Sequence, residues 1–124
     1  MSVILVIDDN PELRTDILDI LRLEKYVVLE AENGSIGFDM IVENQPDLIV
    51  CDIDMPIMTG LELLKILKAN EKYRKIPFII FSGNSDEKTP ALLAELGVDK
   101  YIIKPSSMSR LLNIISHLLK SDIE

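Results

Sequence analysis

Short apolar runs and amphipathic segments alternate along the whole chain. The run Val3–Ile7 holds five apolar residues without polar alternation, which is typical of a strand buried on both faces of a sheet. After Pro11, leucine and isoleucine recur at helical spacing, and Asn10 stands before the proline, where a helix cap is expected. The sequence therefore predicts a buried strand followed directly by a helix that ends near Leu23.

The same strand–helix pattern recurs to the end of the chain. Five such repeats predict a parallel sheet with helices on both faces. We expect an α/β fold of the flavodoxin-like (βα)5 type, a doubly wound parallel sheet with strand order 2-1-3-4-5. The further strands are predicted at 26–31, 47–51, 77–81 and 101–103, and the further helices at 34–45, 61–70, 90–97 and 111–120.

Polar side chains follow the carboxyl ends of four of these strands. Asp8 and Asp9 follow the first strand, Asp52 the third, Ser82 the fourth and Lys104 the fifth. In an open parallel sheet, ligands bind outside the carboxyl ends of the strands, at the crevice where the strand order reverses. That crevice lies between the first and third strands here, so we expect one pocket to collect these side chains.

The residue types in this pocket predict its chemistry. Clustered carboxylates repel one another, which favours a bound cation, and hard oxygen ligands favour Mg²⁺, with Mn²⁺ as a substitute. A carboxylate can attack phosphorus to give an acyl phosphate, and Asp52 is the most central of the three acids. Lys104 offers a positive charge and Ser82 a hydroxyl donor to phosphoryl oxygens. We therefore predict a site for a divalent metal and a phosphoryl group, with Asp52 as the nucleophile.

Composition narrows the class of protein. A chain of 124 residues suits a single domain, and its net charge of −8 argues against direct nucleic-acid binding. No apolar stretch approaches the roughly 20 residues of a membrane span, and Met1-Ser2 leads straight into a strand instead of a signal peptide. Cys51, the one cysteine, lies in an apolar run, so we expect a core thiol and a reducing, cytoplasmic setting.

These motifs resemble the receiver domain of two-component response regulators. The resemblance covers essentially the whole chain, and it favours a stand-alone type similar to the chemotaxis regulator, with one receiver domain over residues 1–124 and no output domain. The motifs that carry it are Val6-Ile7-Asp8-Asp9-Asn10, Asp52-Ile53-Asp54-Met55-Pro56, Met58-Thr59-Gly60, Ile80-Phe81-Ser82-Gly83 and Tyr101-Ile102-Ile103-Lys104-Pro105.

The resemblance implies a role for each pocket residue. Asp52 would accept a phosphoryl group from a phosphohistidine on a histidine kinase or a histidine phosphotransfer protein. Asp9 would bind Mg²⁺ directly, Asp8 directly or through water, and the backbone carbonyl of Asp54 would be a further ligand. Lys104 would pair with the phosphoryl group. The domain would assist its own phosphorylation and dephosphorylation, without acting as an enzyme on other substrates.

The resemblance also implies a switch. Ser82 would move toward the phosphoryl group, and Tyr101 would rotate inward into the space that Ser82 leaves. The face formed by the fourth helix, the fifth strand and the fifth helix would then change shape. That face would bind a downstream target protein, unless the phosphoryl group is relayed onward. We expect a monomer, with phosphorylation-dependent dimerisation through the same face as an open alternative.

Two other functions fit parts of the pattern. Asp52-Ile53-Asp54 resembles the Asp-x-Asp motif of haloacid-dehalogenase-like phosphatases, which also form an aspartyl phosphate. That motif normally follows the first strand, whereas here it follows the third, and the paired acids come before it. A receiver used only as a docking module is disfavoured because every pocket position is intact. The phosphoacceptor is the leading hypothesis, and the phosphatase is the alternative.

Overall fold

The centre of the molecule is a five-stranded parallel sheet. A computed structural model describes residues 2–82, 94–95, 100–103 and 108–123. Each of the four neighbouring strand pairs is parallel, and the order is β2-β1-β3-β4-β5. The predicted α/β flavodoxin-like arrangement is therefore confirmed. The strands are β1 (Val3–Ile7), β2 (Val27–Ala31), β3 (Leu48–Cys51), β4 (Phe78–Ser82) and β5 (Lys100–Ile103).

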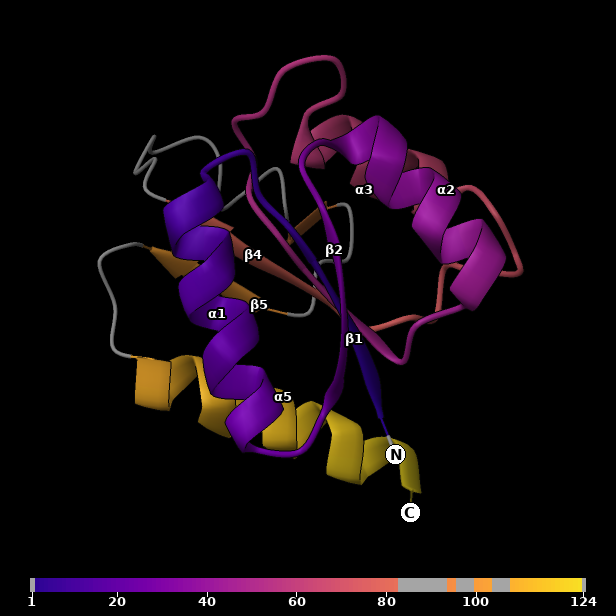
Figure 1. Ribbon diagram of the computed structural model, residues 1–124. Coiled ribbons are helices and arrows are strands. Elements are labelled where there is room, and N and C mark those ends of the chain that lie inside the picture. Colours follow the sequence, from indigo (N-terminus) through magenta and orange to yellow (C-terminus); the bar gives the residue numbers. More distant parts are fainter. Residues whose placement is uncertain (1, 83–93, 96–99, 104–107, 124) are drawn as a thin grey trace.

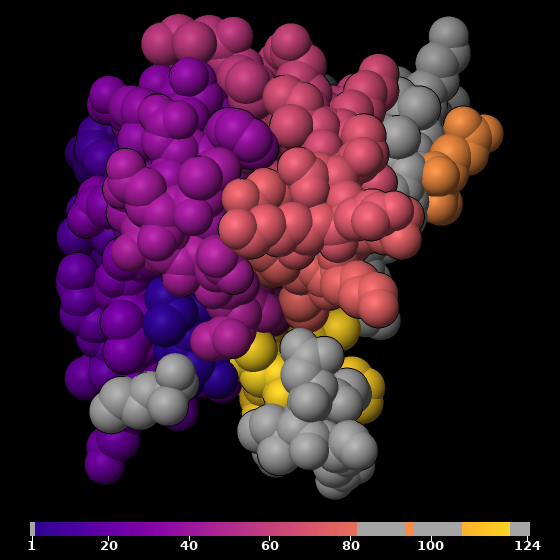
Figure 2. Space-filling model, turned by 90° about the vertical axis from the view of Figure 1, so that its right-hand side faces the viewer, coloured from indigo at the N-terminus to yellow at the C-terminus, as the bar shows by residue number. Residues whose placement is uncertain are grey.

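Helices cover both faces of this sheet (Figure 1). On one face lie α1 (Pro11–Leu23) and α5 (Met108–Ile123), and on the other lie α2 (Gly34–Asn44) and α3 (Gly60–Lys68). Figure 2 shows the molecule from the side of α2 and α3, where these helices and the segment leading to β4 form the surface. The helix predicted at 90–97 lies outside the described residues, except for 94–95, which are helical. In the described segments, no helix has the length and apolarity needed to cross a bilayer.

The central strands are buried on both faces, which explains their unbroken apolar runs. In β3, Leu48 and Val50 pack into the cluster beneath α1 and α5, whereas Ile49 and Cys51 pack into the cluster beneath α2 and α3. Successive side chains of a strand point to opposite faces, so a strand between two helical layers needs apolar residues at every position. Cys51 is fully buried, as predicted for a core thiol.

Side-chain caps start the helices at the carboxyl edge of the sheet. Asn10 accepts hydrogen bonds from the N–H groups of Glu12 (3.0 Å) and Leu13 (3.2 Å), and Pro11 is the first helical residue of α1. Asn33 accepts from the N–H of Ile36 (2.9 Å) at the start of α2. The predicted starts of both helices are thus confirmed, and each cap satisfies N–H groups that have no partner within the helix.

Most of the later elements differ from their predicted bounds by one or two residues at an end, and α5 is longer than the predicted 111–120 by three residues at each end. Two of these differences have a clear local cause. Strand β2 begins at Val27 rather than Tyr26, because the Tyr26 N–H donates to the Leu21 carbonyl (3.1 Å) as part of the helix termination. Helix α3 ends at Lys68 rather than near Asn70, and turns follow at residues 71–75. Both differences depend on hydrogen bonds at the helix ends, where periodicity of apolar residues carries little information.

Helix α3 begins with a capping box. The Thr59 hydroxyl accepts from the Glu62 N–H (3.1 Å), and the Glu62 carboxylate accepts from the Thr59 N–H (3.1 Å). The backbone and side-chain hydrogen bonds with Thr59 lower the pKa of Glu62 below its ordinary value of 4.5. Because the pKa is lower in the folded state, the carboxylate stabilises the fold above pH 4.5, and this contribution disappears as the pH falls through the lowered pKa.

Replacing this carboxylate should change the pH dependence of stability. We expect Glu62→Gln to have a lower free energy of unfolding than the parent protein at pH 7, with the gap closing as the pH falls below about 4.5. Urea unfolding followed by circular dichroism over this pH range measures the gap. Glu71→Gln, an exposed acid in the turn after α3, is the control and should show no such gap. A gap that stays constant with pH would contradict the role of the carboxylate.

Candidate functional site

Three carboxylates meet at the carboxyl edge of the sheet. Asp8 and Asp9 directly follow β1, and Asp52 directly follows β3. These strands are neighbours, with Ile7 in register with Cys51. One oxygen of each of the three carboxylates lies within 4.8 Å of the others. The parallel pairing of two distant strand ends therefore brings together the three acids that the sequence singles out.

The cluster has the donors and nearly the size that a magnesium site requires. Mg²⁺ binds oxygen ligands in an octahedron at about 2.0–2.1 Å, which places opposite ligands about 4.2 Å apart. Asp8 is 2% exposed and Asp52 9% exposed, whereas Asp9 faces solvent. Two buried carboxylates beside a third are costly without compensating charge. The donor set, its spacing and its burial all fit a hard divalent cation with one side open to water.

Main-chain hydrogen bonds hold Asp52 in place. Its N–H donates to the Ile7 carbonyl (3.0 Å), and its Oδ1 accepts from the Ile53 N–H (2.7 Å). The chain then returns, and the Gly60 N–H donates to the Ile53 carbonyl (2.9 Å). A Cβ atom at Gly60 would collide with the Asp52 carbonyl oxygen. Glycine at the start of α3 therefore lets that helix pack directly against the backbone that carries Asp52.

The loop between β3 and α3 contains a strained turn. The Met58 N–H donates to the Pro56 carbonyl (2.7 Å), and the intervening Ile57 has a φ of 70°, so the three residues form a γ-turn. A β-branched residue disfavours this left-handed conformation. Met58 also accepts from the Gly34 N–H (3.1 Å), which ties the loop to the start of α2. Pro56 begins the turn, but nothing in the sequence marks the β-branched Ile57 for a positive φ, so this conformation was not predicted.

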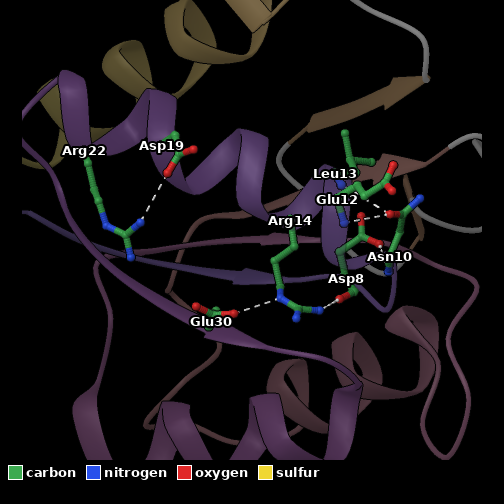
Figure 3. A network of polar contacts seen from close by, with 8 residues as sticks. All are labelled: Asp8, Asn10, Glu12, Leu13, Arg14, Asp19, Arg22 and Glu30. Atoms are coloured by element: carbon green, nitrogen blue, oxygen red, sulfur yellow. Dashed lines mark hydrogen bonds and ion pairs between the residues drawn. The ribbon is translucent and has the colours of Figure 1, made fainter.

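A separate group of contacts holds Asp8 (Figure 3). Its N–H donates to the Ala31 carbonyl (3.1 Å), and its Oδ1 accepts from the Asn10 N–H (2.9 Å). Its carbonyl accepts from Nη1 of Arg14 (2.6 Å), and Nε of Arg14 donates to Glu30 (3.0 Å). Sequence reasoning missed Arg14. The available signal was a cation one turn after the paired acids and close to the start of a helix.

The structure gives less detail for the other predicted site residues. Ser82 is the last residue of β4, and Tyr101 lies in β5, where it is paired with Ile80. Asp54 lies two residues beyond Asp52 and is exposed. Lys104 lies outside the described residues. The backbone at Ser82 is thus at the same edge of the sheet as the acids, and the meeting of Lys104 with them stays a prediction.

A comparison of the sequence with known families decides the identity of the fold and the class of protein. The family model of the response regulator receiver domain matches residues 4–116. The chain belongs to the response regulator receiver domain family. A chemotaxis protein CheY homolog of Campylobacter jejuni is 36% identical over 104 residues, which are 82% of this chain and 80% of that protein. The chain is thus a receiver domain of two-component signalling, and the family match does not support the alternative of a haloacid-dehalogenase-like phosphatase.

Solved structures and longer relatives agree with this assignment. The signal receiver domain of a signal transduction histidine kinase from Syntrophus aciditrophicus has a TM-score of 0.91 and 30% identity, covering 98% of this chain and 92% of that one. The CAI-1 autoinducer sensor kinase/phosphatase CqsS of Vibrio cholerae is 35% identical over 114 residues. This chain spans 17% of that kinase and between 8% and 12% of three other histidine kinases that it matches.

Magnesium should stabilise this receiver domain through its acidic cluster. At a free Mg²⁺ concentration ten times its Kd, we expect the free energy of unfolding to rise by about 1.4 kcal/mol, because an ion held by carboxylates from two strands would bind the folded chain alone. Asp9→Asn should lose most of this gain. Urea unfolding with Mg²⁺ and with a chelator measures it.

The control for this experiment is Asp16→Asn, which removes an exposed acid of α1 outside the cluster. It should keep the full stabilisation by Mg²⁺. Equal stabilisation of Asp9→Asn and the parent protein would show that the ion binds elsewhere.

Proposed function

We propose that this receiver domain accepts a phosphoryl group on Asp52 from a phosphohistidine of a histidine kinase or a histidine phosphotransfer protein. The observation that carries the proposal is the cluster of Asp8, Asp9 and Asp52 at the carboxyl edge of β1 and β3. The match of residues 4–116 to the receiver family supports the same conclusion.

The chemistry follows from the position of Asp52. One of its carboxylate oxygens attacks phosphorus, the new O–P bond forms, and the P–N bond to the donor imidazole breaks. The imidazole nitrogen keeps the electron pair and takes up a proton. The Ile53 N–H, which donates to Oδ1 of Asp52 at 2.7 Å, holds the carboxylate in one orientation. Phosphoryl transfer demands chiefly such positioning and charge neutralisation.

The acids supply the metal site. Asp9 would bind Mg²⁺ directly, Asp8 directly or through water, and Asp52 and the backbone carbonyl of Asp54 would be further ligands. Mn²⁺ would substitute, since it prefers the same oxygen donors. When bound, the ion neutralises the repulsion between the carboxylates and the incoming phosphoryl oxygens. This repulsion is the main obstacle in a pocket whose described side chains are acidic.

The hydroxyl and the amine would complete the pocket. Lys104 would pair with a phosphoryl oxygen, and Ser82 would donate a hydrogen bond to another. Ser82 ends β4, which lies next to β3, and this neighbouring position supports its role. The approach of Ser82 to the phosphoryl group would let Tyr101 turn inward.

The switch would reach partners through one edge of the sheet. Strand β5 is at the end of the strand order, beside β4, and α5 follows it in the chain. We propose that the surface of the 90–97 segment, β5 and α5 changes on phosphorylation and binds a downstream target protein in the cytoplasm. Phosphorylation-dependent dimerisation through this surface is the second use that the same change would serve.

Incubation with acetyl phosphate and Mg²⁺ tests the phosphoacceptor. We expect intact mass spectrometry to show the addition of one phosphoryl group to the parent protein and none to Asp52→Asn, because only Asp52 carries the nucleophile. A chelator should abolish the adduct in the parent. Asp54→Asn, a change at the exposed acid two residues away, should still form the adduct and is the matched control.

Two outcomes would count against the proposal. An adduct of equal yield on Asp52→Asn would place the phosphoryl group on another residue. Turnover of a generic phosphate ester, with more than one product molecule per protein, would instead restore the phosphatase interpretation.

A further inference from the structure

Arg14 connects the acidic pocket to the neighbouring strand. Its Nη1 donates to the carbonyl of Asp8 at 2.6 Å, and its Nε donates to Oε1 of Glu30 at 3.0 Å. Figure 3 shows the guanidinium between these two partners, which come from the end of β1 and from β2. The Arg14 side chain is 15% exposed and that of Glu30 is 52% exposed. The Arg14 side chain is therefore largely enclosed, whereas its partner Glu30 reaches solvent.

The preferences of residues within a helix do not explain why an arginine stands at position 14. Arg14 is the fourth residue of α1, close to the positive end of the helix dipole, where a cation is mildly unfavourable. Arg22 of the same helix is placed in the ordinary way: it lies in the last turn, where the dipole favours it, and pairs with Asp19 at 3.5 Å. The Arg22–Asp19 pair is more than half exposed on both sides. The side-chain contacts of Arg14 instead connect its helix to the end of β1 and to β2.

The bond from Arg14 fixes a particular peptide plane. The carbonyl of Asp8 belongs to the peptide that joins Asp8 to Asp9, and a peptide unit is rigid. The Ala31 carbonyl already holds the N–H of Asp8, and the Asn10 N–H holds its carboxylate. With the carbonyl also held, the directions in which both acidic side chains leave the backbone are set together.

We propose that Arg14 is a positioning residue for the metal pocket, which it serves by fixing the Asp8–Asp9 peptide, with Glu30 orienting its guanidinium. The inference rests on the proposed function, since it concerns the same Mg²⁺ site. Groups that orient metal ligands without touching the metal typically change affinity by about 10- to 100-fold. Arg14 is such a group, because it donates to the backbone carbonyl of Asp8 and not to a carboxylate of the cluster.

The positive charge of Arg14 should weaken the binding of Mg²⁺, whereas its positioning of the backbone should strengthen it. The two effects can therefore be told apart by experiment. If Arg14 acted only as a nearby positive charge, its removal would strengthen the binding of Mg²⁺, because like charges repel. If it acts by position, its removal weakens the binding. Lysine keeps the charge but cannot reproduce two divergent donors in one plane, so Arg14→Lys isolates the geometric contribution.

The experiment titrates Mg²⁺ alone into the whole chain and follows the amide resonances of Asp9 and Asn10 by NMR. We expect Arg14→Lys to raise the Kd for Mg²⁺ about tenfold. Arg14→Gln should raise it too, despite the lost positive charge. The amide resonance of Asp9 should also move in the metal-free spectra of both variants. Arg22→Lys, a change on the same helix in an exposed pair, should leave the Kd and this resonance unchanged.

The outcomes separate a failure of the positioning role from a failure of the proposed metal site. Urea unfolding in the presence of a chelator identifies any variant that is not folded, and the other Arg14 variant then carries the test. Unchanged affinity in Arg14→Lys, or tighter binding in Arg14→Gln, overturns the positioning role while the parent still binds Mg²⁺. A parent protein whose Asp9 amide does not respond to Mg²⁺ would overturn the proposed metal site itself.

Discussion

The parallel pairing of β1 with β3 is the constraint on which the site depends. It places Ile7 beside Cys51, 44 positions later in the chain, and the Asp52 N–H donates to the Ile7 carbonyl across the junction. The acids that follow both strands then leave the sheet at one edge. A shift of one residue in this pairing would turn every side chain of one strand to the opposite face. The observed pairing, together with the hydrogen bond from Asp52 to Ile7, therefore sets where the carboxylates leave the sheet.

Hydrogen bonds to backbone carbonyls and close packing hold the loops around the acids. Gly60 lets α3 begin against the carbonyl of Asp52, and Gly34 lets the start of α2 reach the carbonyl of Met58. The guanidinium of Arg14 holds the carbonyl of Asp8, in the turn that carries Asp8 and Asp9. Three loops that approach one edge of the sheet are therefore tied down by hydrogen bonds to backbone carbonyls and by close packing, which constrains the backbone from which the acidic side chains extend. Such constraint is what a site for charge neutralisation needs.

The pocket gathers features that local rules of stability oppose. It holds two buried carboxylates beside a third, a β-branched residue with positive φ at Ile57, and a cation near the start of a helix. Violations of local preference are expected at functional sites, where the surrounding fold supplies compensation. Here the compensation comes from the apolar clusters on both faces of the sheet and from caps such as Asn10. The concentration of strain and charge at one edge agrees with the membership of the chain in the receiver family.

The amino-acid sequence by itself determined the elements, their order and the chemical types at the strand ends. Apolar periodicity and caps such as Asn10 act over a few residues, so they can be recognised without the fold, and they led to the acids Asp8, Asp9 and Asp52. Only the tertiary structure decided that Arg14 holds the Asp8 carbonyl, that Gly60 faces the backbone of Asp52 and that Ile57 takes up a γ-turn. The Arg14 and Gly60 contacts join residues only six and eight positions apart, and the turn at Ile57 spans three residues. Their geometry is set by how the loops fit against the strand ends, and the periodicity of apolar residues carries little information about it.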